Sequence, residues 1–157
     1  ELFSYWNSLY LADTLKYRFT NMEHPTPIKV IKMIDDPAYL MFNVSDVESG
    51  IIISDFALEN FTGKAAQIHF SMRPSNDSKM SLGLADKVTD MILDDWKDFK
   101  DLEQTYLDTI YGLTPVDNRV ACIFVLKTGF KKIGILPNGI MYLGKVTDAM
   151  LTVKTRH

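Results

Sequence analysis

Hydrophobic and polar positions alternate along three consecutive segments in the first half of the chain, and this pattern predicts three strands. The expected strands are residues 39–47, 51–59 and 65–72. Turns at Ser49-Gly50 and around Gly63 separate them, so they should form an antiparallel meander. The third strand is the clearest, because its even-numbered residues are apolar and its odd-numbered residues from Gln67 to Ser71 are polar.

Apolar residues spaced three and four apart predict helices at residues 4–20 and 79–93, whereas residues 28–34 fit either a short strand or a helical turn. A further short helix is expected between Thr114 and Gly129. Thr114 is its expected N-cap, Pro115 its first residue and Asp117 the partner of Thr114 in a capping box. Gly129 follows Lys127 and suits the left-handed conformation that ends a helix.

Two more strands are expected at residues 106–111 and 130–136. Pro137-Asn138-Gly139 then predicts a turn, and residues 140–153 return as a strand that bends at Gly144. The element order indicates one mixed α/β (α+β) domain over residues 1–157. Both strand–helix–strand connections should be right-handed and should impose parallel pairing. The final strand is expected at an exposed edge, where it offers pairing to another copy of the chain.

Composition limits the classes of function. The chain has 157 residues, of which 46% are hydrophobic and 24% charged, enough for a core that needs no disulfide or metal. A formal net charge of -3 argues against non-specific nucleic-acid binding, and the acidic stretch 94–103 is expected to be a solvated helix end or loop. Neither a signal peptide nor an apolar run of about 18 residues is seen, so no membrane partner is expected. A single cysteine, Cys122, suits a reducing compartment, and we expect a cytoplasmic protein.

Two windows carry a resemblance to a known family. They are Met80-Ser81-Leu82-Gly83-Leu84-Ala85 and the stretch from Asn118 to Phe130, each at the corresponding place in the element order. Over residues 39–153 the chain resembles the GNAT-type N-acetyltransferases. The resemblance implies a three-layer fold whose mixed, mostly antiparallel sheet is splayed between its middle parallel strands. The family's opening strand has no clear counterpart here and is either missing or replaced by residues 28–34.

The resemblance implies acetyl-coenzyme A as a co-substrate and no metal. In the family, a Gln/Arg-x-x-Gly-x-Gly/Ala turn presents backbone N–H groups to the coenzyme pyrophosphate, an anion that helix N-termini favour. Met80 departs from the first position of that motif, and Arg73 and Lys79 are candidates for the missing positive charge. The other residues implied to bind the coenzyme are Phe70, Met72, Ser81, Leu82, Gly83, Leu84, Ala85 and Asn118.

The implied reaction is direct attack of a primary amine on the acetyl thioester, which needs a base and a donor to the developing oxyanion. His69 and Asp108 are candidate bases. A surface or sheet-face histidine is the favoured interpretation of His69, and a solvated strand face explains Asp108 as well as a base does. Tyr111 is a candidate proton donor, as is Tyr142. No histidine pair has metal-ligand spacing.

One departure from the family keeps a second interpretation open. Many members carry a proton-donating Tyr four residues before the helix-ending Gly, and here that position is Val125, preceded by Phe124. The alternative is a non-catalytic GNAT-like domain for binding or assembly, similar to some encoded by bacteriophages. The broad apolar surface of the N-terminal helix suits a homo-oligomer or a protein partner. The acceptor amine is either a small molecule or a protein amine.

Overall fold

The computed structural model describes residues 2–11, 26–34, 39–72, 78–94 and 107–156. Its elements, in chain order, are α1 (Leu2–Leu11), α3 (Pro27–Ile34), β1 (Leu40–Ser45), β2 (Ile52–Thr62), β3 (Ala65–Met72), α4 (Ser78–Asp94), β4 (Thr109–Pro115), α5 (Arg119–Lys127), β5 (Lys131–Tyr142) and β6 (Lys145–Thr155). The predicted helix segment 12–20, the loop residue Arg73 and most of the acidic stretch 94–103 lie outside the described residues.

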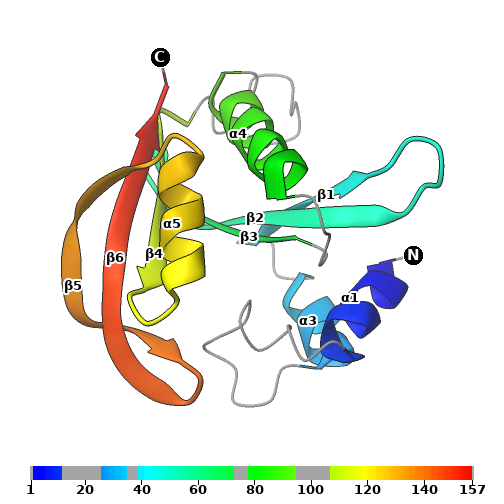
Figure 1. Cartoon of the computed structure of the whole chain (residues 1–157), viewed down its shortest axis with the longest axis horizontal. Coiled ribbons are helices and arrows are strands. Elements are labelled where there is room, and N and C mark those ends of the chain that lie inside the picture. Colours follow the sequence, from blue (N-terminus) through cyan, green and yellow to red (C-terminus); the bar gives the residue numbers. More distant parts are fainter. Residues whose placement is uncertain (1, 12–25, 35–38, 73–77, 95–106, 157) are drawn as a thin grey trace.

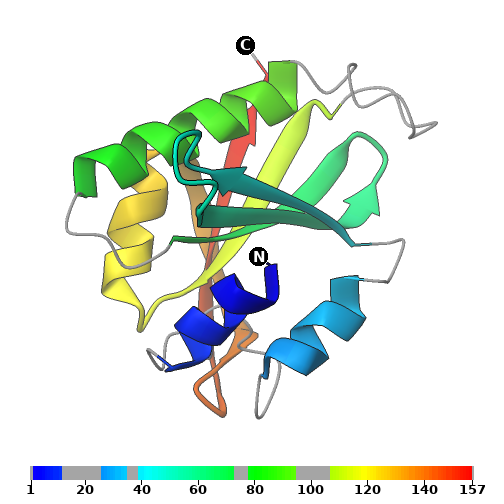
Figure 2. The ribbon, with the colours of Figure 1, turned by 90° about the vertical axis from the view of Figure 1, so that its right-hand side faces the viewer.

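The strands form one six-stranded sheet in the order β1-β2-β3-β4-β6-β5. Neighbouring strands are antiparallel except for β3 and β4, which are parallel. Helices α4 and α5 cover one face of the sheet, and α1 and α3 lie on the other (Figures 1 and 2). The predicted meander β1–β2–β3 and the parallel pair after it are confirmed. The result is three layers with a mixed, mostly antiparallel sheet in the middle.

The main core lies between the sheet and the pair α4 and α5. Its strands contribute alternate residues such as Phe56, Leu58 and Ile68, in agreement with the period of two along a strand. Helix α4 contributes residues one turn apart, including Val88 and Ile92. The opposite face of β2 and β3 is thereby turned toward α1. This arrangement places the polar side chains of β3 on the α1 side.

The segment 28–34, left open between strand and helix, forms α3. Val30 is buried while Ile28 is 62% exposed, so the segment uses the periodicity of a helix and not that of a strand. No described element before β1 is therefore a strand, and the idea that residues 28–34 replace the family's opening strand is wrong.

The start of α5 corrects the predicted cap. Asn118, not Thr114, is the N-cap, and its Oδ1 accepts the backbone N–H of Ala121 at 3.1 Å. Thr114 and Pro115 instead extend β4, where they pair with β6. The strand conformation is favoured here because β6 pairs with the whole length of β4. A capping-box pattern in the sequence carries no information about that distant partner. The other end is as predicted, with Gly129 at φ +81°.

The last hairpin also differs from the prediction. Residues 137–139 do not turn the chain but form an irregularity within β5, and Asn138 there has φ +51°. The turn comes at Leu143 and Gly144, which both have positive φ as a two-residue hairpin turn requires. Its left-handed leucine gave no sequence signal, since such residues rarely adopt this conformation.

The final strand lies inside the sheet and not at its edge. Strand β6 is inserted between β4 and β5, and it is antiparallel to both. The second strand–helix–strand connection, through α5, therefore does not produce direct parallel pairing as predicted. Strand β5 forms the outer edge, with exposed apolar side chains that include Ile133 and Ile135.

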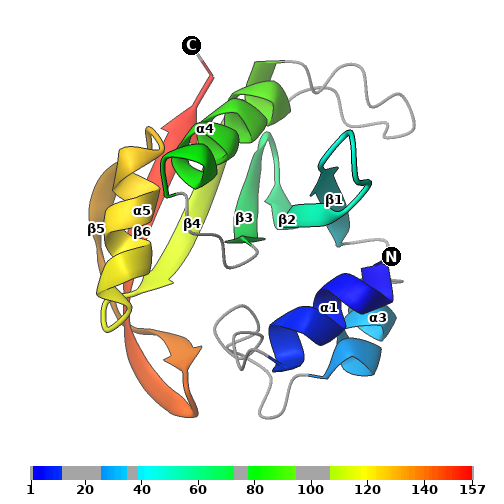
Figure 3. The ribbon, with the colours of Figure 1, turned by 45° about the vertical axis from the view of Figure 1, so that its right-hand side comes forward.

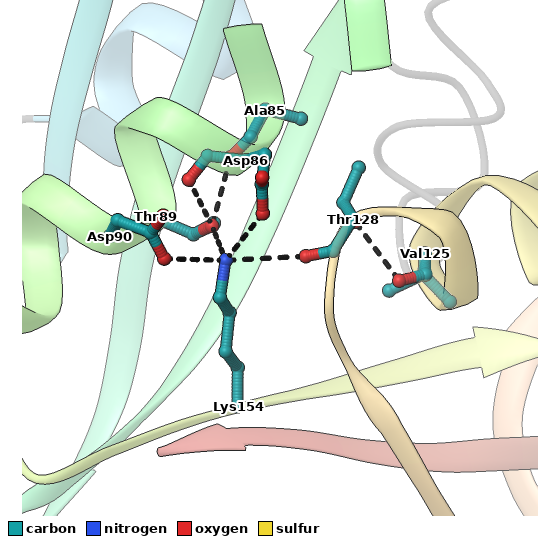
Figure 4. Close-up of polar contacts among 7 residues, drawn as sticks. All are labelled: Ala85, Asp86, Thr89, Asp90, Val125, Thr128 and Lys154. Atoms are coloured by element: carbon teal, nitrogen blue, oxygen red, sulfur yellow. Dashed lines mark hydrogen bonds and ion pairs between the residues drawn. The ribbon is translucent and has the colours of Figure 1, made fainter. Parts of the chain in front are cut away.

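A buried lysine joins the sheet to both covering helices (Figure 4). The Lys154 ammonium on β6 lies 2.8 Å from Asp86 Oδ1 and 2.7 Å from Asp90 Oδ1, both on α4. It also donates to Thr89 Oγ1 at 2.9 Å and to the carbonyl of Thr128, the C-cap of α5, at 3.3 Å. These contacts supply the counter-charges and acceptors that a buried cation needs.

Candidate functional site

The parallel strands β3 and β4 diverge after a short paired stretch (Figure 3). Their pairing runs only from Ala65 with Thr109 to Gln67 with Tyr111. Strand β3 continues to Met72 and remains paired with β2, while β4 continues to Pro115 and remains paired with β6. We call the diverging parts, residues 68–72 of β3 and 112–115 of β4, the β3–β4 fork. Within the described residues, the two inner edges of the fork are not paired with each other.

Main-chain groups of β3 point into the fork. The carbonyl of Lys64 accepts N–H groups from β4, whereas the carbonyl of Ser71 accepts the hydroxyl of Ser54 on β2. Backbone groups alternate in direction along a strand, so those of Phe70 and Met72 point toward β4. These two residues are the ones for which the resemblance implied main-chain contacts to the coenzyme. Whether they make such contacts stays a prediction.

Helix α4 begins close to the open end of the fork, since it starts six residues after β3 ends (Figures 1 and 3). Helix N–H groups without an intrahelical partner belong to the first turn, here beginning at Ser78. The window Ser81–Ala85 therefore lies one turn further into the helix than a phosphate-binding turn would. Gly83 has open space where a Cβ would be placed, and Ala85 is buried in the core. Lys79 lies in the first turn, and Arg73 falls outside the described residues.

The α4 and α5 side of the fork is lined by aromatic rings. Phe70 on β3 contacts Phe124 on α5, with ring centroids 5.4 Å apart, and Phe56 on β2 at 5.9 Å. Val125 is buried in the core. Phe124 is therefore the α5 side chain that packs against Phe70 of β3. Neither Phe124 nor Val125 carries a proton donor, so the departure noted in the sequence holds in three dimensions.

The α1 side of the fork carries a histidine–carboxylate pair. His69 Nε2 on β3 lies 2.6 Å from Glu59 Oε1 on β2. Both side chains are partly exposed, at 24% and 30%. An ionised carboxylate only accepts hydrogen bonds, so Nε2 carries a hydrogen; when the ring is neutral, the lone pair is on Nδ1. His69 is the first residue of β3 on this face beyond the paired stretch, at the start of the fork.

Tyr111 belongs to the same group of side chains. Its neighbours across the sheet are Gln67 and then Glu59, which together form one row over three strands. Burial and the negative charge of Glu59 raise the pKa of the Tyr111 phenol above its ordinary value. Tyr111 is therefore protonated, and able to donate, over an even wider pH range than a free tyrosine. The Gln67 side chain is oriented by Asn60, whose Nδ2 donates to Gln67 Oε1 at 2.9 Å.

A buried carboxylate lies next to this group. Asp55 on β2 accepts the Tyr5 hydroxyl of α1 at 3.0 Å and the Ser71 hydroxyl of β3. Asp55 is fully buried, and these two hydroxyl groups satisfy its carboxyl oxygen beneath α1. This cluster fixes α1 against β2 and β3, and α1 thereby forms one boundary of the face that carries His69.

Two other candidates from the sequence lie away from the fork. Asp108 precedes β4 at the paired end of the two strands, and its half-exposed carboxylate lies 3.4 Å from Lys64 Nζ. Tyr142 is beside the hairpin turn of β5 and β6. The structure thus brings His69 and Tyr111 together and leaves Asp108 and Tyr142 apart from them.

Asn118 and Cys122 lie at and near the start of α5. Asn118 already uses its Oδ1 as the N-cap, which leaves its amide N–H groups as the donors that a ligand could receive. Burial raises the pKa of the Cys122 thiol, an effect that outweighs the positive charge of Lys132. Cys122 Sγ also lies 3.5 Å from the carbonyl of Pro115. The thiol is thus a poor nucleophile.

Glu59 is the site residue that the sequence did not predict. A plain hairpin through Gly63 would pair Glu59 with Ile68 and turn its side chain toward the core. The observed pairing shifts by one residue between Glu59 and Thr62, where Asn60 has φ +51°, and Glu59 pairs with Gln67 instead. Asn is the residue after Gly that most readily adopts this conformation, so Asn60 was the only available signal.

Two findings concern other classes of site. Among the described residues, His, Cys, Asp and Glu side chains form no group of three that could hold a metal ion. In the same part of the chain, none of the helices is long and apolar enough to cross a membrane.

The fold matches solved structures, although no protein-family model and no curated protein sequence matches the chain. The ribosomal-protein-S5-alanine acetyltransferase of Vibrio fischeri is similar over 99% of this chain and 86% of its own, with a TM-score of 0.69 and 15% identity. The spermidine N-acetyltransferase of Vibrio cholerae, in complex with CoA and spermine, is similar over 98% and 89%, with a TM-score of 0.70 and 19% identity. The chain therefore has a GNAT-type N-acetyltransferase fold, as the resemblance implied.

Proposed function

We propose that this chain, which has the fold of the GNAT-type N-acetyltransferases, transfers an acetyl group from acetyl-coenzyme A to a primary amine. The observation that carries the proposal is the β3–β4 fork, with main-chain groups of Phe70 and Met72 pointing into it beside the N-terminus of α4. Strands that separate in mid-sheet leave hydrogen-bonding groups for a ligand, since buried backbone groups need partners.

The coenzyme is proposed to lie along the α4 and α5 side of the fork. Its pyrophosphate would bind at the first turn of α4, where backbone N–H groups and the helix dipole favour an anion. The thioester carbonyl would accept a main-chain N–H from β3, which supports the oxyanion as the amine attacks. The bound coenzyme supplies the activated acetyl group. Phe70 and Phe124 offer apolar contacts to the arm that carries it.

The amine is proposed to approach from the α1 side, where His69 is located. His69 would take a proton from the ammonium form of the acceptor, and the amine nitrogen would then bond to the carbonyl carbon. As the C–S bond breaks, the second amine proton is released and the thiolate sulfur gains a proton. Tyr111 is the proposed donor for the sulfur, because its phenol is protonated and shares a row with Gln67 and Glu59 at the base of the fork.

The acceptor is proposed to be a small-molecule amine or a protein amine. A related fold is known with spermine bound beside CoA, and another belongs to an enzyme named for an alanine of a ribosomal protein. The sequence identities are 19% and 15%, so the acceptors of these two enzymes do not identify the acceptor of this chain. The proposal is therefore limited to the chemical class of primary amines.

A second candidate function is binding of coenzyme A without transfer, as in an assembly domain. One observation favours it. At the place on α5 where many members of the family carry a proton-donating tyrosine, this chain has Phe124 and the buried Val125. In this case the fork would bind the coenzyme, and no acceptor would be acetylated.

Thermal shift measurements test the two candidates in sequence. Acetyl-coenzyme A should raise the melting temperature selectively, with ATP as a control for a nucleotide without the thioester arm. Release of free thiol is then followed with a panel of primary amines. Binding with amine-dependent thiol release supports the transferase. Binding without release across the panel supports the assembly domain, and no shift at millimolar ligand would refute both.

A further inference from the structure

The pair formed by Glu59 and His69 carries an inference about how the site works. We propose that Glu59 is a positioning residue, which holds the His69 imidazole so that Nδ1 accepts the proton of the acceptor ammonium. The inference rests on the proposed function and adds to it a residue that no sequence motif identified. Glu59 itself need not touch the acceptor.

The geometry supports a functional pair. The Nε2–Oε1 distance of 2.6 Å is short for a hydrogen bond between nitrogen and oxygen, as expected for a charge-assisted bond. The pair spans β2 and β3 diagonally, because His69 is opposite Ala57 and Glu59 is opposite Gln67. Glu59 therefore approaches His69 from the paired end of the strands. The imidazole is left at the start of the fork, on the side from which an acceptor would enter.

The contact also fixes the chemistry of the ring. With the Nε2 hydrogen donated to the carboxylate, Nδ1 is the nitrogen that accepts a proton. The imidazolium formed in this step is stabilised by the negative charge of Glu59, so proton transfer from an ammonium group becomes more favourable. The proton later leaves His69 for solvent, and the pair returns to its starting state.

Other titratable groups face the same side of the sheet. Among the described residues, these include Asp55 on β2, Tyr111 on β4 and Tyr5 on α1. Asp55 is buried and held by Tyr5 and Ser71, and the Tyr111 phenol stays protonated over a wide range. Glu59 is in direct contact with His69, so its replacement should change how the imidazole titrates.

A merely structural pair would behave differently. Both side chains are partly exposed, at 24% and 30%, and ion pairs of this kind contribute about 0–1 kcal/mol to stability. Glu59→Gln should thus unfold at nearly the same urea concentration as the parent chain. An effect on turnover without one on stability indicates positioning.

The experiment compares Glu59→Gln, Glu59→Asp and His69→Gln with a matched control, Glu48→Gln. Glu48 is an exposed glutamate in the turn between β1 and β2, remote from the fork in sequence and sheet position. The kcat and kcat/KM values of each variant are measured against pH with the best amine of the panel. Urea unfolding and acetyl-coenzyme A thermal shifts are recorded in parallel.

Glu59→Gln should lower the plateau kcat about tenfold and move the acidic limb of the pH profile to lower pH, because the imidazolium loses its counter-charge. His69→Gln should abolish the limb and lower kcat by about 10²-fold or more. Glu59→Asp should restore the position of the limb in part. The coenzyme-induced shift should not change in any variant.

Two results would overturn the inference. One is a pH profile of Glu59→Gln that coincides with that of Glu48→Gln in an active enzyme, which leaves the proposed function intact. The other is an unchanged midpoint of the His69 nitrogen signals in an NMR titration of Glu59→Gln, a measurement that needs no turnover. The chain has three histidines, so His69→Gln assigns these signals. Absence of turnover in the parent chain, despite coenzyme binding, would refute the proposed function and the positioning role with it.

Discussion

Replacing both carboxylates around Lys154 with amides should destabilise the fold by much more than the sum of the two single replacements. Lys154 is only 6% exposed, whereas Asp86 and Asp90 are 53% and 43% exposed. The two carboxylates lie one turn apart on α4, and each is within 2.8 Å of the same ammonium. Either Asp86→Asn or Asp90→Asn therefore leaves the buried cation one counter-charge.

The magnitudes follow from this exposure. Loss of one half-exposed carboxylate should cost about 0.5–1 kcal/mol, since water replaces much of the interaction. Loss of both leaves a buried ammonium with only neutral partners, such as Thr89 and Thr128, and should cost about 3–5 kcal/mol. The coupling energy between the two positions should thus be about 2 kcal/mol, within the range found for residues that share a buried network.

Urea unfolding followed by circular dichroism gives the four stabilities of this cycle. Asp94→Asn, at the exposed last residue of α4, is the matched control. Adding Lys154→Met to the double variant should recover stability, because it removes the uncompensated charge while keeping the length of the stem. Additivity of the two amide replacements within about 0.5 kcal/mol, or a further loss on adding Lys154→Met, would refute the reasoning.

Four further predictions concern single residues. Gly129→Ala should destabilise the fold by about 1–2 kcal/mol, because φ is +81° and the new Cβ would lie 3.2 Å from Lys154 Cε. A Cβ at Gly83 would meet open space, so Gly83→Ala should leave the free energy of unfolding unchanged or raise it by up to about 1 kcal/mol. Similar urea midpoints for Gly129→Ala and Gly83→Ala would contradict this difference. Cys122 should be alkylated by iodoacetamide more slowly than a free cysteine peptide at pH 8, because its raised pKa leaves less thiolate; equal rates would argue against burial as the controlling factor. Phe124→Tyr should raise kcat, by at most about 10²-fold, if protonation of the leaving thiolate limits the rate, and an unchanged kcat would assign that role elsewhere.

Local rules predicted the elements that neighbouring residues determine. Strand β3 has the predicted bounds, because alternation and the turn at Gly63 define both its faces and its start. The end of α5 was predicted as well, since Gly129 offers a left-handed conformation at no steric cost. By contrast, the start of α5 was predicted in the wrong place, because Thr114 and Asp117 have the spacing of a capping box. Thr114 instead belongs to β4, where it pairs with Met150 of β6, a partner distant in the sequence.

The candidate site shows the same limit more sharply. The sequence identified His69 and Tyr111 as candidates because each lies on a strand that the hydrophobic pattern predicts. Glu59 was not identified, since one irregularity at Asn60 decides which face of β2 its side chain occupies. A one-residue shift moves every later side chain to the other face, so alternation alone predicts the wrong environment.

The two faces of the sheet divide stability from chemistry. On the α4 and α5 side, the strands bury apolar side chains and the Lys154 ammonium, whose partners belong to α4 and to the end of α5. On the α1 side, His69 and Glu59 are partly exposed and form an ion pair between β3 and β2. Substitutions at His69 or Glu59 should therefore change the proposed turnover at little cost in folding free energy. Substitutions at Lys154 should instead lower the free energy of unfolding and leave the proposed chemistry unchanged. They should affect coenzyme binding only if they shift α4 relative to α5.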